Sequence, residues 1–156
     1  MKKIVSIFVA MFMSMGMLIA AEPKSCGLTD ADVRNYCKNF DSITKEFEAI
    51  DIDDNGKGSA EDIVKAEKIL EKYGISGPNR LIKVSVISQC MIVIAYDAEA
   101  KKDTTAGALL GKLGTDPMKK YRDQLNTSDY NKVKNNSAEV LKVIEKKKQT
   151  QKSKKK

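Results

Sequence analysis

Residues 81–96 read LIKVSVISQCMIVIAY, the most apolar stretch of the chain after its first 20 residues. Its many β-branched residues would suit a strand. However, its apolar residues do not alternate, and the stretch continues into 97–102, which are good helix formers. We therefore predict one buried central helix with neighbours on several sides. As a membrane span this segment is too short, and Lys83 interrupts it.

Two amphipathic helices are predicted before this segment. The first begins after Thr29, with Asp32 three residues later as a near-capping-box partner, and the second begins at Ser59 and stops at Gly74. Both carry apolar residues at three- and four-residue spacing, which is typical of a core-facing stripe. These residues are Val33, Tyr36, Cys37, Phe40, Ile43, Phe47 and Ile50 in the first helix and Ile63, Ala66, Ile69, Leu70 and Tyr73 in the second.

Three shorter elements are predicted after the central helix. A short helix or turn is expected over 104–113, and a helix over 118–125 follows a cap at Asp116 and Pro117. A last helix is capped by Ser128 or Asp129 and continues to Ile144. The sequence therefore predicts an all-α fold, a small bundle of five or six helices around a central apolar helix, in one domain over 22–145.

The first 21 residues have the three parts of a secretory signal peptide. Two lysines precede an apolar run over 4–20, and small residues stand before a polar boundary at Glu22. We predict cleavage after Ala20 or Ala21 and a periplasmic or secreted mature chain. An uncleaved membrane anchor is the alternative, since the run is at the lower length limit for a spanning helix.

The net charge of +7 is concentrated at the end of the chain, where residues 146–156 hold seven lysines and no acid. This segment cannot bury apolar surface, so we predict a disordered lysine-rich tail. One interpretation is electrostatic attachment to an anionic envelope surface, lipid head groups or an acidic partner. The other is a solubilising end without a ligand. Nucleic acid is not expected, because no aromatic residue is interleaved with these lysines.

Residues 51–62 read DIDDNGKGSAED. A calcium loop of the EF-hand type places oxygen ligands at its first, third, fifth, seventh, ninth and twelfth positions and a glycine at the sixth. The segment resembles such a loop, closest to the bacterial dockerin-like variety, which ends in aspartate. The resemblance implies a calcium site formed by Asp51, Asp53, Asn55, the carbonyl of Lys57, Ser59 and Asp62.

A turn followed by a helix cap would select much the same residues. Asp, Asn and Gly are turn formers, and Ser59 with Asp62 makes a capping box without any ion. Asp62 is one methylene shorter than the usual glutamate, and Gly58 stands where an apolar residue normally pairs with a second loop. The clustered acids of the loop nevertheless repel one another unless a cation lies among them. We therefore expect at most a single weak calcium site with a structural role.

The mature chain contains three cysteines, Cys26, Cys37 and Cys90. Export to an oxidising compartment favours one disulfide between two of them, and the spacing does not indicate which two.

Histidine and tryptophan are both missing from the chain. Their absence excludes histidine-based catalytic triads and histidine-ligated zinc. We predict a non-enzymatic, exported binding or interaction module whose partner is unknown. An envelope-associated structural protein that is tethered by its basic tail is the first alternative, and a small carboxylate-dependent hydrolase is the second.

Overall fold

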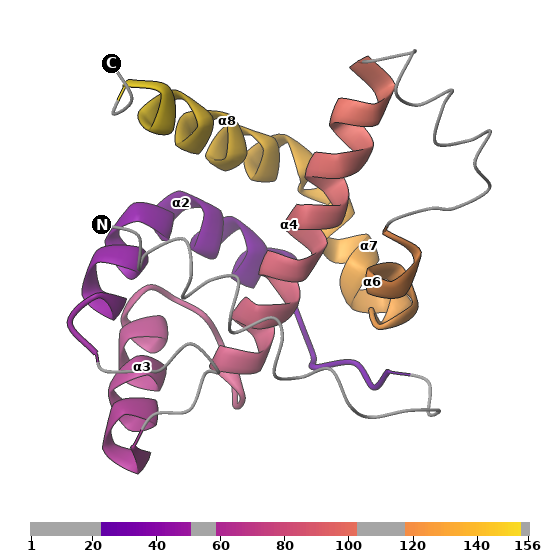
Figure 1. The fold of residues 1–156 in the computed structure, drawn as a ribbon. Coiled ribbons are helices and arrows are strands. Elements are labelled where there is room, and N and C mark those ends of the chain that lie inside the picture. Colours follow the sequence, from indigo (N-terminus) through magenta and orange to yellow (C-terminus); the bar gives the residue numbers. More distant parts are fainter. Residues whose placement is uncertain (1–22, 51–58, 103–117, 154–156) are drawn as a thin grey trace.

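A computed structural model describes residues 23–50, 59–102 and 118–153. Within these ranges the chain forms six α-helices and no strand, which confirms the predicted all-α bundle. Figure 1 shows their arrangement around one long helix. The helices are α2 (Asp30–Phe47), α3 (Ala60–Lys72), α4 (Arg80–Lys102), α6 (Lys119–Asp123), α7 (Thr127–Asn135) and α8 (Ser137–Ser153).

Helix α4 is the centre of the bundle, as its sequence predicts. It contacts each of the other five described helices, and it crosses the molecule between α2 and α3 on one side and α6 and α7 on the other (Figure 1). Ile87, Cys90 and Val93 are fully buried along it. The prediction that this segment is too short for a membrane span is wrong, because the helix continues past Tyr96 and Arg80–Ala100 is long and apolar enough by length and composition. Its contacts with the five other described helices are those of a core helix.

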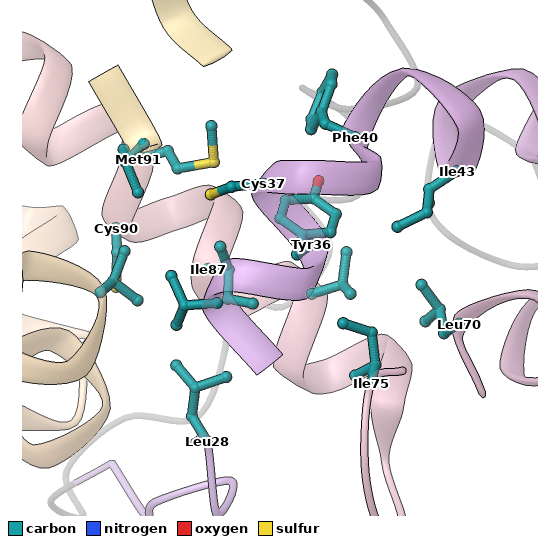
Figure 2. Packing of buried hydrophobic residues seen from close by; sticks show 14 of the residues in the cluster. Leu28, Tyr36, Cys37, Phe40, Ile43, Leu70, Ile75, Ile87, Cys90 and Met91 are labelled. Atoms are coloured by element: carbon teal, nitrogen blue, oxygen red, sulfur yellow. The ribbon is translucent and has the colours of Figure 1, made fainter. Parts of the chain in front are cut away.

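Helix α2 begins and packs as predicted. Thr29 Oγ accepts from the Asp32 backbone N–H at 3.1 Å, and the Asp32 carboxylate accepts from the Thr29 backbone N–H at 3.0 Å, which completes the capping box. The predicted stripe is buried from Val33 to Phe47, where the helix ends, whereas Ile50, predicted as its last member, lies beyond the helix and is half-buried. Figure 2 shows Tyr36 of this stripe in the same interior as Ile87 of α4.

Helix α3 begins at the predicted Ser59 cap and is followed by Gly74 at a positive φ of 80°. Asn35 Nδ2 donates to the Gly74 carbonyl at 2.9 Å, and a Cβ at this position would lie only 2.7 Å from the same nitrogen. The backbone conformation therefore favours glycine, and any larger residue would also displace the Asn35 side chain from its hydrogen bond. The predicted stripe is wrong at Ile63, which is 43% exposed, because α3 buries only Ala66 and Leu70 fully.

A buried ion pair joins α2, α4 and the turn between α3 and α4. The Lys83 and Asp32 side chains are 4% and 0% exposed, and Lys83 Nζ lies 2.9 Å from Asp32 Oδ2. Lys83 Nζ also donates to the Ser76 carbonyl at 2.7 Å, while the Ser76 N–H and hydroxyl donate to Asp32 Oδ1 at 2.7 and 2.9 Å. The lysine that interrupts the apolar segment therefore has charged and polar partners inside the core.

The caps of the C-terminal helices differ from the prediction. Helix α6 spans only Lys119–Asp123, without a side-chain cap, and the expected elements over 104–117 lie outside the described residues. Helix α7 is capped by Asn126, whose Oδ1 accepts from the backbone N–H groups of Ser128 and Asp129 at 3.0 and 3.2 Å. The predicted caps Ser128 and Asp129 are therefore the second and third residues of the helix, because Asn126 supplies the acceptor.

The last predicted helix is two helices, α7 and α8, which meet at Asn136. The Asn136 side chain donates to the carbonyl of Lys132, four residues earlier, and to Asp30 Oδ1, both at 2.8 Å. Its own backbone N–H bonds to the Val133 carbonyl, three residues earlier. In a continuous helix, the Lys132 carbonyl would accept from the Asn136 backbone N–H. Here it accepts from the Asn136 side chain instead, and the chain changes direction at this residue.

Asp129 anchors the segment that precedes α2. Its side chain is 1% exposed and accepts from Ser25 Oγ and from the Cys26 backbone N–H, both at 2.8 Å. Asn126 Nδ2 donates to the Pro23 carbonyl at 2.8 Å. A buried carboxylate is costly without donors, so these bonds make the first described residues part of the fold.

The predicted disordered tail is helical as far as Ser153, so the expected boundary at residue 145 falls inside α8. Packing against α2 accounts for the longer helix. Lys146 forms an ion pair with Asp41, and the Lys147 ammonium lies 3.9 Å from the centre of the Phe40 ring. An aromatic face attracts a cation and can cover the aliphatic part of a lysine side chain. A lysine tail without neighbouring residues would lack both interactions.

Replacing Lys83 with methionine should destabilise the protein by about 3–5 kcal/mol, because Asp32 would stay buried and lose its cation. Urea unfolding followed by far-ultraviolet circular dichroism measures the loss. The double variant Lys83→Met/Asp32→Asn buries no charge and should recover at least half of it. A single variant as stable as the natural chain would contradict the role of the pair.

Stability should also fall between about pH 4 and pH 2. Burial alone would raise the pKa of the Asp32 carboxyl, but hydrogen bonds from Ser76, Lys83 and Thr29 lower it from the ordinary 3.8 to about 2. Because the pKa of Asp32 is lower in the folded than in the unfolded state, the Asp32 carboxylate stabilises the fold above pH 4. This stabilisation is lost as the carboxylate is protonated at lower pH. Its size is about 2 kcal/mol. Asp32→Asn should flatten this part of the stability–pH curve, and an unchanged slope would rule out Asp32 as its source.

Candidate functional site

The predicted calcium ligands lie only partly within the described residues. Asp51, Asp53, Asn55 and Lys57 fall outside them. Ser59 and Asp62 are described and are joined to each other, with Ser59 Oγ 2.6 Å from Asp62 Oδ2 and the Asp62 backbone N–H donating back to Ser59 Oγ at 3.1 Å. These two residues therefore form the helix cap that the sequence offers as the alternative interpretation. The calcium site stays a prediction.

All three cysteines are free thiols, so the structure does not contain the predicted disulfide. Cys90 is fully buried in α4, Cys37 is buried in α2, and Cys26 is half-buried before α2. Burial raises the pKa of all three thiols, to about 11 for Cys26 and about 12 for Cys37 and Cys90. The Asp129 carboxylate adds to the rise at Cys26 and Cys90.

Helices α2 and α8 lie side by side and run in the same direction. Arg34 Nη1 approaches Asn136 Oδ1 at 3.5 Å near the start of both helices, and Asp41 pairs with Lys146 further along. The residue numbers increase along both helices from the first contact to the second, so the two helices are parallel. Residues about 100 positions apart in the sequence therefore face each other across one surface.

A groove of about 240 Å³ opens between these two helices. Its lining contains an apolar pair and a charged set, contributed by both helices. Cys37, which is only 7% exposed, and Val143, which is half-buried, form the apolar part. The charged residues are Arg34 and Lys38 from α2 and Glu139, Lys142 and Lys146 from α8.

The residues that border the groove carry a net positive charge. Arg34 and Lys38 are four residues apart on α2, and Lys142 and Lys146 are four apart on α8, so two neighbouring cations from each helix border the groove, whose own accessible surface is mainly apolar. Glu139 is the one carboxylate among the lining residues. Asp41 pairs with Lys146, but both side chains are mostly exposed, and such a pair adds little in water. With Asp41 counted beside Glu139, the four cations and two carboxylates leave a net charge of +2 at the groove.

The chemistry of the groove favours binding an anion over reacting with one. Burial, and then the nearby Glu139 carboxylate, raise the pKa of the Cys37 thiol to about 12. The thiolate is the reactive form of cysteine, so Cys37 is a poor nucleophile at neutral pH. Arginine and lysine, by contrast, donate charge-assisted hydrogen bonds to carboxylates and phosphates.

Sequence reasoning missed this groove as a site. It recognised the lysines after residue 145 but placed them in a disordered tail, and it assigned no role to Arg34, Lys38 or Lys142. The available signal was the four-residue spacing of the cations on each helix. That spacing indicates a cationic face on each helix but not that the two faces meet.

No known protein-family model matches this chain, and no curated protein or solved structure matches it either.

Thiol labelling should follow the burial of the three cysteines. At pH 8 iodoacetamide should modify Cys26 slowly and leave Cys37 and Cys90 unmodified, because thiolates are scarce at these pKa values. Intact-mass spectrometry measures the number of adducts, and unfolding in guanidinium should expose every reduced thiol. Rapid labelling of Cys37 in the folded protein would contradict a closed apolar floor in the groove. One labelled thiol after unfolding without reductant would reveal the predicted disulfide.

Proposed function

We propose that this protein is an exported helical interaction module that docks onto an anionic component of the cell envelope through the groove between α2 and α8. The observation that carries the proposal is the gathering of Arg34, Lys38, Lys142 and Lys146 around one groove with a single lining carboxylate. Arg34 and Lys38, and likewise Lys142 and Lys146, are four residues apart on one helix, where like charges repel mildly, and Glu139 and Asp41 offset only part of this charge. A bound anion supplies that counter-charge.

The groove combines the two functions that the sequence suggests, a binding module and a basic tether. As a disordered tail, residues 146–156 would attract any negatively charged surface. In the folded chain, Lys146 and Lys147 belong to α8 and contact α2. Binding through ordered cations loses less conformational entropy than binding through a disordered segment. Export rests on the predicted leader over 1–21.

Binding is favoured over hydrolysis by the make-up of the groove. Glycosidase-type hydrolysis uses two carboxylates that flank the bond to be broken. Glu139 is the single carboxylate among the residues that line the groove. We therefore propose a non-enzymatic role for this surface.

Vesicle co-sedimentation tests the proposal. The mature protein should bind vesicles that contain anionic lipid, should ignore neutral vesicles, and should lose most binding between 0.05 and about 0.5 M salt because exposed charges are screened. Lys142→Gln/Lys146→Gln should weaken binding about 10- to 30-fold, at about 1 kcal/mol for each cation near the surface.

Lys65→Gln/Lys68→Gln is the matched control, since it removes two exposed lysines from α3. It should bind almost as well as the natural chain. Equal losses in the two double variants would show that total charge, and not the groove, drives binding. No binding to any anionic vesicle would contradict the proposal.

We also propose that a calcium ion fixes the angle between α2 and α3. The support is local: α2 ends at Phe47 and α3 begins at Ala60, so helices flank the loop on both sides as an EF-hand requires. The spacing of the oxygen-bearing residues over 51–62 agrees with that motif.

The melting temperature of the mature protein should be several degrees higher in millimolar calcium than in chelator, because an ion that binds only the folded state stabilises it. Circular dichroism at both conditions measures the difference. Asp51→Ala should abolish it, whereas Asp123→Ala, which removes an exposed acid from α6, should not. Equal melting temperatures with and without calcium would end this part of the proposal.

A further inference from the structure

We infer that one face of α4 is the contact surface of a homodimer, in which the α4 helices of two copies pack against each other in antiparallel directions. Five uncharged residues define this face, the α4 stripe: Ile82, Ser85, Gln89, Ile92 and Tyr96. The groove between α2 and α8 plays no part in this contact.

The bundle leaves the α4 stripe partly uncovered over about four turns of the helix. Its residues recur at alternating spacings of three and four, which places them on one side of α4 and is the pattern with which two helices pack side by side. Ile82 and Ile92 are each 38% exposed. Ile87, on the opposite side of the helix, is fully buried in the core (Figure 2). A second helix along the stripe would remove both isoleucines from water.

The order of residues along the stripe makes a second copy the partner that fits. Ile82 and Ile92 lie five residues before and after Ile87, and Ser85 and Gln89 lie two residues before and after it. A two-fold axis that crosses the stripe at this level therefore sets Ile82 of each copy against Ile92 of the other, and Ser85 against Gln89. Each contact occurs twice, as a two-fold interface requires. The stripe carries no charge, so two copies do not repel each other there.

Ser85 and Gln89 set the direction of the pair. Ser85 Oγ is shielded from water, and in the described part of the chain it is the one buried side-chain polar atom without a hydrogen-bond partner. In the antiparallel pair, the Gln89 amide of the other copy can donate to this hydroxyl once the Ser85 side chain turns outward to another rotamer. A parallel pair would set serine against serine and amide against amide. The antiparallel pair therefore satisfies an atom that the isolated chain leaves without a partner.

Sedimentation velocity of the chain without residues 1–21 tests the pairing. Because one pair of helices buries less than the roughly 1,600 Å² of a standard interface, the protein should be monomeric at about 1 µM and mostly dimeric at about 300 µM. The equilibrium should be nearly the same in about 0.05 M and about 0.5 M salt, because the stripe is uncharged. A monomer at every concentration would overturn the inference and leave the stripe to a different partner.

A charge placed in the stripe should prevent pairing. Ile92→Arg should raise the dissociation constant at least tenfold, because each dimer would bury two unpaired cations. Val64→Arg is the matched control, since Val64 is 52% exposed on α3, and it should dimerise as the natural chain does. Circular dichroism checks that both variants are folded. A folded Ile92→Arg that dimerises normally rules out the stripe.

Removal of the central amide tests the polar contact and does not depend on the fate of Ile92→Arg. Gln89→Ala removes two hydrogen bonds from each dimer and should weaken the dimer about tenfold. Gln124→Ala, which removes an exposed amide after α6, should have no effect. Equal dissociation constants for the two variants would overturn the pairing of Gln89 with Ser85.

Cysteine cross-linking determines the direction of the pair. The Ile82→Cys and Ile92→Cys variants are oxidised separately and as a mixture, and non-reducing electrophoresis detects covalent dimers. The antiparallel pair predicts cross-links in the mixture, and in each variant alone no more than the natural chain shows after the same treatment. Cross-linking of each variant with itself, and not with the other, would overturn the antiparallel arrangement.

Discussion

The buried pair between Asp32 and Lys83 is the interaction on which the arrangement of this bundle depends. An ammonium group inside the most apolar helix would be severely destabilising without an anion and a carbonyl beside it. Asp32 and the Ser76 carbonyl supply both. Because Asp32 lies in the first turn of α2 and Ser76 in the turn that leads to α4, meeting these requirements fixes three segments at once.

The pair between Asp32 and Lys83 also determines which face of α2 lies at the surface, and the groove depends on that face. The face of α2 that carries Val33 and Tyr36 is turned into the core, and Tyr36 is held there by Ser88 of α4. The neighbouring face, with Arg34 and Lys38, is left at the surface. The break at Asn136 then directs α8 along that face, so that its lysines meet the cations of α2. Stability in the core and charge at the surface are therefore parts of one arrangement.

Much of this fold could be predicted from the sequence, because the signals are local. The capping box of Thr29 and Asp32, the cap at Ser59 and the stop at Gly74 each involve residues within a few positions of one another. Lys83 was recognised only as an interruption, since its partner lies 51 residues away. The break between α7 and α8 was missed because Asn136 is an ordinary helix residue until its side chain takes the Lys132 carbonyl.

The candidate site was less predictable than the fold for the same reason. The calcium loop could be proposed from twelve consecutive residues, whereas the groove requires knowing that 34–38 and 139–146 lie together. Composition indicated correctly that cations gather near the C-terminus. It could not indicate that Phe40 and Asp41 would hold Lys147 and Lys146 in a helix.

Amide hydrogen exchange of the chain without residues 1–21 tests this arrangement most directly, because the groove exists only if the lysine-rich half of α8 is folded against α2. Amides over 142–150 should be protected well above random-coil rates, although less than those of Ile87 and Val93 in the core. If amides after Glu145 exchange at random-coil rates while those of α2 and α4 stay protected, the lysines form a loose tail and the binding groove does not exist.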